Sequence, residues 1–115
     1  MINFKGKIWL YSTPADMRKS IDSLSILVSN KMNLNPTNEE IFVFYNKAKD
    51  KIKVLWWSVN GFCLFYKRLE KQRFKIPLTI NDNVNLDPRE LRWLLDGLDL
   101  SKIKGHKKLK FKNFC

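Results

Sequence analysis

The chain has 115 residues, of which 44% are hydrophobic and 13% aromatic, and its 22 Lys and Arg against 11 Asp and Glu give a formal net charge of +11. This length suits one domain with a modest core, and no apolar stretch approaches the ~20 residues of a membrane span. Cys63, Cys115 and the single His106 provide neither a disulfide framework nor a zinc site, so we expect no metal and no cofactor.

The positive charge is unevenly distributed. Nine basic residues and two acids lie between Lys47 and Lys75, and six lysines without an acid lie between Lys102 and Lys112. A field of this sign favours a polyanionic partner such as DNA. A Lys-rich surface can also simply keep a protein in solution, and 17 of the 22 basic residues are Lys. Charge alone leaves both interpretations open.

The N-terminal part predicts a strand followed by a helix. Residues 7–11 are aromatic and β-branched, as in a short strand. Thr13 as N-cap, Pro14 at the first helical position and Asp16 after it predict a helix that begins at Pro14 and ends near residues 30–33. Its apolar stripe consists of Met17, Ile21, Leu24, Leu27 and Val28.

The middle of the chain predicts an antiparallel meander. A strand at residues 41–45 and a polar turn at 46–50 precede a hairpin with Asn60-Gly61 as its two-residue turn. The predicted pairs on one face are Val59 with Phe62, Trp57 with Leu64, Leu55 with Tyr66, and Lys53 with Arg68. Like charges directly opposite each other are unfavourable unless an anion such as a phosphate lies between them. We expect Glu70 to pair with Lys51 and Asp50 with Lys71.

The C-terminal part predicts a second helix and a basic tail. Residues 74–76 are a candidate strand before Pro77. Asp87 as N-cap, Pro88 and Glu90 begin a helix that Gly97 would stop. The predicted fold is α+β, with a mostly antiparallel four- to five-stranded sheet in the order β-α-β-β-β-α and two helices packed on it. We predict a single domain over residues 1–100 and a basic tail over 101–115, for which an edge strand is the alternative.

Three groups of basic residues are candidates for contact with nucleic acid. Those at the open end of the hairpin are Lys53, Lys67, Arg68, Lys71 and Arg73; those in the first turn of the first helix are Arg18 and Lys19; those in the tail are Lys107, Lys108 and Lys110. For Arg18 and Lys19, a solvated helix face paired with Asp22 explains the sequence equally well.

Aromatic residues of the hairpin suggest a second kind of surface. Trp57, Phe62 and Tyr66 are candidate anchors for a protein partner. Adjacent strand residues point to opposite faces, so at most one of Trp56 and Trp57 can line a given surface. We expect both to belong to the core, with stacking on nucleic-acid bases as the alternative.

The sequence shows no recognisable arrangement of catalytic residues. The carboxylates at the helix starts are explained as caps, and no Ser-His-acid, Cys-His or Gly-rich phosphate motif is present. Metal-dependent strand transfer needs clustered carboxylates, which we do not find. We therefore predict that the protein is not an enzyme.

Several segments together resemble a known family. These are Trp9-Leu10, residues 14–19 (PADMRK), 53–57 (KVLWW), 61–70 (GFCLFYKRLE) and 91–97 (LRWLLDG). They are similar to the accessory protein, often called TnpB, encoded by the second open reading frame of IS66-type bacterial insertion sequences. Ser20 and Ser23 are a mild departure from the small residues that this family commonly has after the Arg-Lys pair. The resemblance implies a role in transposition and assigns the chemistry to a different, larger protein of the element.

These observations lead to one expected function and one alternative. We expect a cytoplasmic accessory protein of transposition, since no secretion signal is apparent, that binds DNA through the basic end of the hairpin and the tail. The alternative is an interaction module that docks the transposase or another subunit. The sequence leaves the oligomeric state open.

Overall fold

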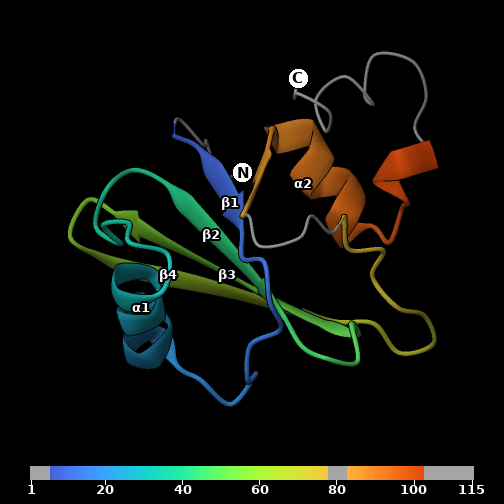
Figure 1. Ribbon diagram of the computed structural model, residues 1–115, viewed down its shortest axis with the longest axis horizontal. Coiled ribbons are helices and arrows are strands. Elements are labelled where there is room, and N and C mark those ends of the chain that lie inside the picture. The colour runs from blue at the N-terminus through green and yellow to red at the C-terminus, as the bar shows by residue number, and fades with distance from the viewer. Residues whose placement is uncertain (1–5, 78–82, 103–115) are drawn as a thin grey trace.

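A five-stranded sheet with one helix on each face forms the protein (Figure 1). The computed structural model describes residues 6–77 and 83–102. Its elements are β1 (Ile8–Leu10), α1 (Ile21–Asn30), β2 (Ile41–Tyr45), β3 (Lys51–Ser58), β4 (Gly61–Arg68), β5 (Val84–Leu86), α2 (Pro88–Leu95) and the short 3-10 helix η1 (Leu100–Lys102). This is the α+β fold that the sequence predicts.

The strand order is β4-β3-β2-β1-β5. β1 and β2 are parallel, and every other neighbouring pair is antiparallel. Parallel neighbours need a crossover connection, and α1 lies within the one between β1 and β2.

The sheet divides the core into two clusters. On one face, α2 contributes Leu91 and Leu94 to a cluster that includes Ile8, Val43 and Val54. On the other face, α1 contributes Leu24 and Val28, which pack with Phe42, Phe44 and Leu55. All five residues of the central strand β2 are buried, as expected for a strand covered on both faces.

The first helix begins later than predicted, at Ile21 with Ser20 as its N-cap. The backbone N–H of Ala15 donates to the carbonyl oxygen of Tyr45 at 2.8 Å, and Ala15 is buried, so this segment continues along the end of β2. The Asp16 carboxylate bonds to Arg18 instead of supporting a helix start at Pro14. The prediction of the helix end is confirmed at Asn30.

The hairpin has a different register from the predicted one. Ser58 lies opposite Gly61, so the turn residues are Val59 and Asn60, and Val59 has a φ of 53°. Each partner therefore shifts by two residues, which leaves the face assignments unchanged. Trp57 now lies opposite Phe62 with ring centroids 5.0 Å apart and planes at 82°. This edge-to-face pair favours the observed register over one with Asn60-Gly61 in the turn.

In the observed hairpin register, Lys53 and Arg68 do not lie opposite each other, so the predicted pair of like charges is absent. Lys53 lies opposite Tyr66, and Arg68 lies opposite Lys51. The opposed cations Lys51 and Arg68 each have a carboxylate partner of their own, described below.

The chain after the hairpin differs from the prediction in two ways. Residues 74–76 are not a strand; Phe74 is instead a core residue, only 1% exposed. The sequence analysis did not identify β5, which pairs with β1 at the sheet edge. Its three residues are too short for a periodic signal.

The prediction for the second helix is confirmed at both ends. Asp87 accepts from the backbone N–H of Glu90, and the Glu90 side chain accepts from the backbone N–H of Asp87, each at 2.8 Å. Gly97 follows α2 with a φ of 83°, in the left-handed region that glycine adopts readily. Within residues 6–77 and 83–102, neither helix has the length or the apolar stretch needed to cross a bilayer.

Candidate nucleic-acid interface

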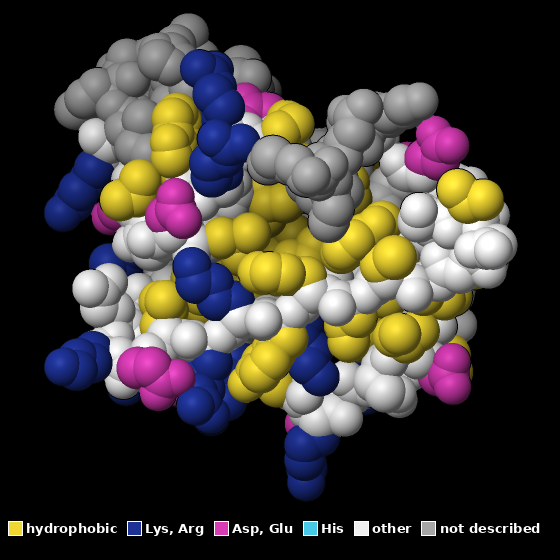
Figure 2. Space-filling model, turned by 180° about the vertical axis from the view of Figure 1, so that it is seen from behind, with side chains coloured by type: hydrophobic (Ala, Val, Ile, Leu, Met, Phe, Trp, Pro, Cys, Tyr) yellow, Lys and Arg dark blue, Asp and Glu magenta, His cyan; other side chains and the backbone are white. Residues whose placement is uncertain are grey.

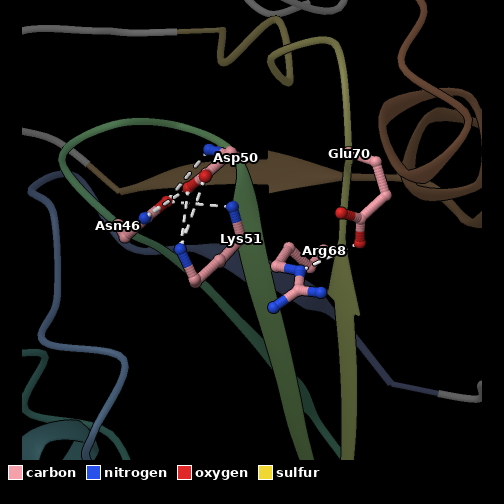
Figure 3. A network of polar contacts seen from close by, with 5 residues as sticks. All are labelled: Asn46, Asp50, Lys51, Arg68 and Glu70. Atoms are coloured by element: carbon pink, nitrogen blue, oxygen red, sulfur yellow. Dashed lines mark hydrogen bonds and ion pairs between the residues drawn. The ribbon is translucent and has the colours of Figure 1, made fainter.

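One end of the sheet combines the turn Asn46–Asp50 with the segment 69–75, and we call this the basic end. The side chain of Asn46 organises the turn (Figure 3). Its Oδ1 accepts hydrogen bonds from the backbone N–H groups of Asp50 at 3.1 Å and Lys51 at 2.9 Å, and its Nδ2 donates to the Asp50 carboxylate at 2.6 Å. Lys49 adopts a φ of 62°. The turn is therefore a defined structure that fixes where its lysines project.

The segment after β4 is fastened to this turn. The backbone N–H of Leu69 donates to Asp50 O at 2.8 Å, and that of Phe74 donates to Lys49 O at 2.6 Å. The buried ring of Phe74 anchors the segment in the core. In Figure 1 both segments lie at the end of the sheet away from the β3–β4 turn. Basic residues far apart in the sequence thus share one end of the molecule.

The basic end carries cations without an internal carboxylate partner. In the part of the chain that the structure describes, no Asp or Glu lies within ion-pair distance of these side chains. The cations concerned are Lys47, Lys49, Lys71, Arg73 and Lys75. Lys75 is also close enough to Asp99 to help lower the pKa of that carboxyl, whose main partner is the Ser101 hydroxyl. Within the basic end, Lys47, Lys49, Lys71 and Arg73 are therefore the cations with the least internal compensation.

Lys53 and Lys67, two of the predicted contact residues, bond to backbone oxygens within the protein. Lys53 Nζ donates to Met17 O at 2.7 Å and to Lys19 O at 2.9 Å. Lys67 Nζ donates to Leu95 O, the last residue of α2, at 2.7 Å. A Lys near a helix C-terminus satisfies carbonyls that lack an intrahelical partner. Both ammonium groups have structural partners.

Arg68 and Arg18 form ion pairs with nearby acids. Arg68 Nε lies 2.9 Å from Glu70 Oε2, and this carboxylate raises the pKa of Arg68 (Figure 3). Arg18 contacts both oxygens of Asp16, with its Nη2 at 2.7 Å, and this holds the pKa of Asp16 well below its ordinary value. Both pairs are solvent-exposed, and exposed ion pairs contribute little net stability. A phosphate can therefore compete for either guanidinium at low cost.

Two predicted ion pairs are wrong. Glu70 pairs with Arg68 rather than with Lys51, and Asp50 pairs with Lys51 at 3.3 Å rather than with Lys71. Each acid contacts a cation one or two residues away in the sequence, whereas the predicted pairs depended on a hairpin register that the structure does not have. The consequence is that Lys71 remains available.

The other predicted basic residues fall into two groups. Lys71, Arg73 and Lys19 lie at or beside the basic end, since the segment before α1 is attached to Tyr45 and to Lys53. Lys107, Lys108 and Lys110 lie outside the described residues. The sequence analysis did not name Lys47, Lys49 and Lys75 as site residues. These lysines belong to the turn and to the segment after β4. Tertiary contacts bring the two segments together, so local sequence does not show that their lysines share one surface.

The aromatic residues of the hairpin differ in how far they are buried. Trp56 and Trp57 are both partly exposed. Trp56 packs against the α2-side core cluster, as predicted, whereas Trp57 belongs to neither core cluster of the described residues. Phe62 packs against the α1 cluster, and Tyr66 is 47% exposed beneath the ammonium group of Lys53. Figure 2 shows hydrophobic side chains gathered across the middle of the back face, with Lys and Arg side chains mainly on its left side, where the basic end lies.

Comparisons with known proteins identify the family. The family model described as IS66 Orf2 like protein matches residues 6–105. Two relatives come from Sinorhizobium fredii (strain NBRC 101917 / NGR234). Uncharacterized protein y4hO is 34% identical over 93 residues, which are 81% of each chain. Uncharacterized protein y4jC is 30% identical over 98 residues, which are 85% of this chain and 84% of that protein. No solved structure gives a significant match. The chain therefore belongs to the IS66 Orf2-like family, whose role is accessory to the transposition of insertion sequences.

Proposed function

We propose that this protein is a non-catalytic, cytoplasmic accessory factor of transposition that binds the DNA backbone through its basic end. The observation that carries the proposal is the convergence of cations from the turn Asn46–Asp50 and the segment 69–75 without matching carboxylates among the described residues. Family membership supplies the context, because transposition acts on DNA.

The chemistry of this end suits phosphate rather than base recognition. Lysines on a turn present mobile point charges that neutralise a polyanion without reading its sequence. Arg68 and Arg18, whose ion pairs are exposed, can add two further contacts by exchanging a carboxylate for a phosphate. The formal charge of +11 also steers the protein toward DNA at low salt.

Fluorescence anisotropy with a duplex from the ends of the element tests the proposal. If about five phosphates are contacted, the logarithm of the binding constant should fall with the logarithm of salt concentration with a slope near −4 to −5. The double variant Lys71→Glu/Arg73→Glu should bind at least about tenfold more weakly, with a slope reduced by about two.

A matched control distinguishes the basic end from net charge. Lys7→Glu/Lys31→Glu changes the charge by the same amount at exposed positions before β1 and after α1, at the opposite end of the sheet. It should retain most of the affinity. Equal losses in the two double variants, or no binding by the wild type at low salt, would contradict the proposed site.

Docking of the transposase through the hairpin is the second candidate function. It is favoured by the partly exposed rings of Trp57 and Tyr66 and by Val59, which is 92% exposed at the hairpin turn. Co-purification with the transposase that survives nuclease treatment and high salt, and that is lost in Trp57→Ala, would support docking over DNA binding.

A further inference from the structure

The two edges of the sheet differ greatly in length. β5 forms one edge with three residues, whereas β4 forms the other with eight, all of them paired in unbroken register with β3. Among the described residues, no strand pairs with the outer side of β4. Natural proteins usually protect such an edge with Pro, a bulge or inward charges. β4 (GFCLFYKR) has no Pro and no bulge, and its charges lie only at Lys67 and Arg68.

The side chains of β4 favour a partner that is not acidic. The two cations of β4, Lys67 and Arg68, are its last two residues, and the six residues before them carry no charge. The centre of the strand instead exposes two aromatic rings on opposite faces, Phe65 (40%) and Tyr66 (47%). An apolar, aromatic strand with unpaired backbone groups matches another strand of the same kind.

We propose that β4 pairs antiparallel with β4 of a second copy of this chain, joining two five-stranded sheets into one continuous sheet. A two-fold axis perpendicular to the sheet keeps every residue on its own face, so a residue can lie opposite itself. With Phe65 opposite the same residue of the second copy, Leu64 lies opposite Tyr66, which forms apolar cross-strand pairs on both faces. Arg68 then lies opposite Phe62, so the cations of the two copies are at opposite ends of the seam.

The pairing has a consequence for the proposed function, and this consequence alone rests on DNA binding. Antiparallel strands place the two basic ends at opposite ends of the seam, because each basic end follows the end of its own β4. The dimer would therefore present two separate surfaces to DNA, which allows it to hold two duplex segments at once.

Light scattering after size exclusion tests the dimer without DNA, at about 0.15 M salt. The Debye length of about 8 Å then screens the long-range repulsion between the two positive chains, but not the interaction between side chains directly opposite each other in the seam. The wild type should have the mass of a dimer. Phe65→Lys and Phe65→Glu should each be monomeric, because each places like charges opposite one another at the centre of the seam. An equimolar mixture of the two variants should recover the dimer, because Lys then lies opposite Glu.

Ile26→Lys is the matched control, since Ile26 is 58% exposed on the helix α1 and takes no part in strand pairing. It also replaces an exposed apolar side chain by Lys, and it should remain dimeric. Circular dichroism confirms that each variant is folded. A monomeric wild type, a dimer unaffected by Phe65→Lys, or a mixture of folded variants that stays monomeric would each overturn the proposal. Because DNA is absent, failure here is distinguishable from failure of the proposed DNA binding.

Discussion

The ammonium group of Lys53 donates a hydrogen bond at 2.7 Å to the backbone oxygen of Met17, which lies 36 residues earlier in the chain. A second hydrogen bond reaches Lys19 O. Lys53 thereby joins β3 to the irregular segment that precedes α1, and it explains how a segment without regular structure keeps its position beside the basic end.

Replacing Lys53 should affect stability more than DNA binding. Lys53→Met retains the aliphatic stem but leaves two backbone oxygens without their charged donor, so the free energy of unfolding should fall by about 1–3 kcal/mol. Urea denaturation measures this change. Lys47→Met, at an exposed turn position, is the control and should change stability by less than about 0.5 kcal/mol while weakening DNA binding. The reverse pattern would show that Lys53 faces the DNA.

The turn at the basic end should give a pH-dependent contribution to stability. The amide of Asn46, followed by the ammonium of Lys51, lowers the pKa of Asp50 in the folded protein. A carboxyl whose folded pKa is lowered stabilises the fold above its unfolded pKa of about 3.9, and this contribution is lost as the pH falls through the lower folded value.

Asn46→Ala separates this effect from the rest of the turn. Loss of the two backbone hydrogen bonds that Asn46 accepts should cost about 1–2 kcal/mol at any pH. The Asp50 contribution adds to this loss near neutral pH and vanishes in strong acid. The stability difference between wild type and variant should therefore shrink toward low pH in denaturation series. A difference that grows on acidification would contradict this origin of the pKa shift.

Predictions from the sequence succeeded where local signals agreed with tertiary packing. Asp87, Pro88 and Glu90 specify the start of α2 by themselves, and the structure keeps their capping box. Similar signals at Pro14 failed because the backbone of Ala15 bonds to Tyr45 at the end of β2, a contact between segments 30 residues apart that local sequence does not reveal.

The hairpin turn shows the same competition and leads to a stability prediction. Val59 is β-branched and highly exposed, yet its φ is 53°, a region that costs a residue with a Cβ roughly 1–2 kcal/mol. Val59→Asn should relieve part of this strain and raise the free energy of unfolding by about 0.5–1 kcal/mol, because Asn tolerates the left-handed region. Ser58→Asn is the control, because Ser58 lies outside the left-handed region, and it should not raise the free energy of unfolding. A loss of stability in Val59→Asn would indicate that Asn60-Gly61 form the turn after all.

The positive charge of the candidate site was predictable from the sequence, but the residues that make up the site were not. The excess of Lys and Arg between residues 47 and 75 pointed to the region in which the proposed site lies. A cation is available to DNA only if no group of the protein already binds it. Its partners within the protein depend on the hairpin register and on distant backbone carbonyls such as Met17 O and Leu95 O. Because Lys53 donates to Met17 O and Lys19 O, we place the proposed phosphate contacts on the neighbouring turn instead.

The ion pair between Asp16 and Arg18 should restrain DNA binding. Asp16 accepts three hydrogen bonds from the Arg18 guanidinium beside the basic end, and that guanidinium is otherwise exposed. Asp16→Asn removes one negative charge and releases Arg18 for a phosphate. We expect binding to become severalfold tighter and the salt slope to steepen by about one.

Asp22→Asn is the control. Asp22 is an exposed residue in the first turn of α1, and its replacement removes the same charge without releasing an arginine. Anisotropy titrations at several salt concentrations compare the two variants, and the slope should steepen only for Asp16→Asn. Identical slopes would show that Arg18 does not reach the DNA and that net charge alone controls the affinity.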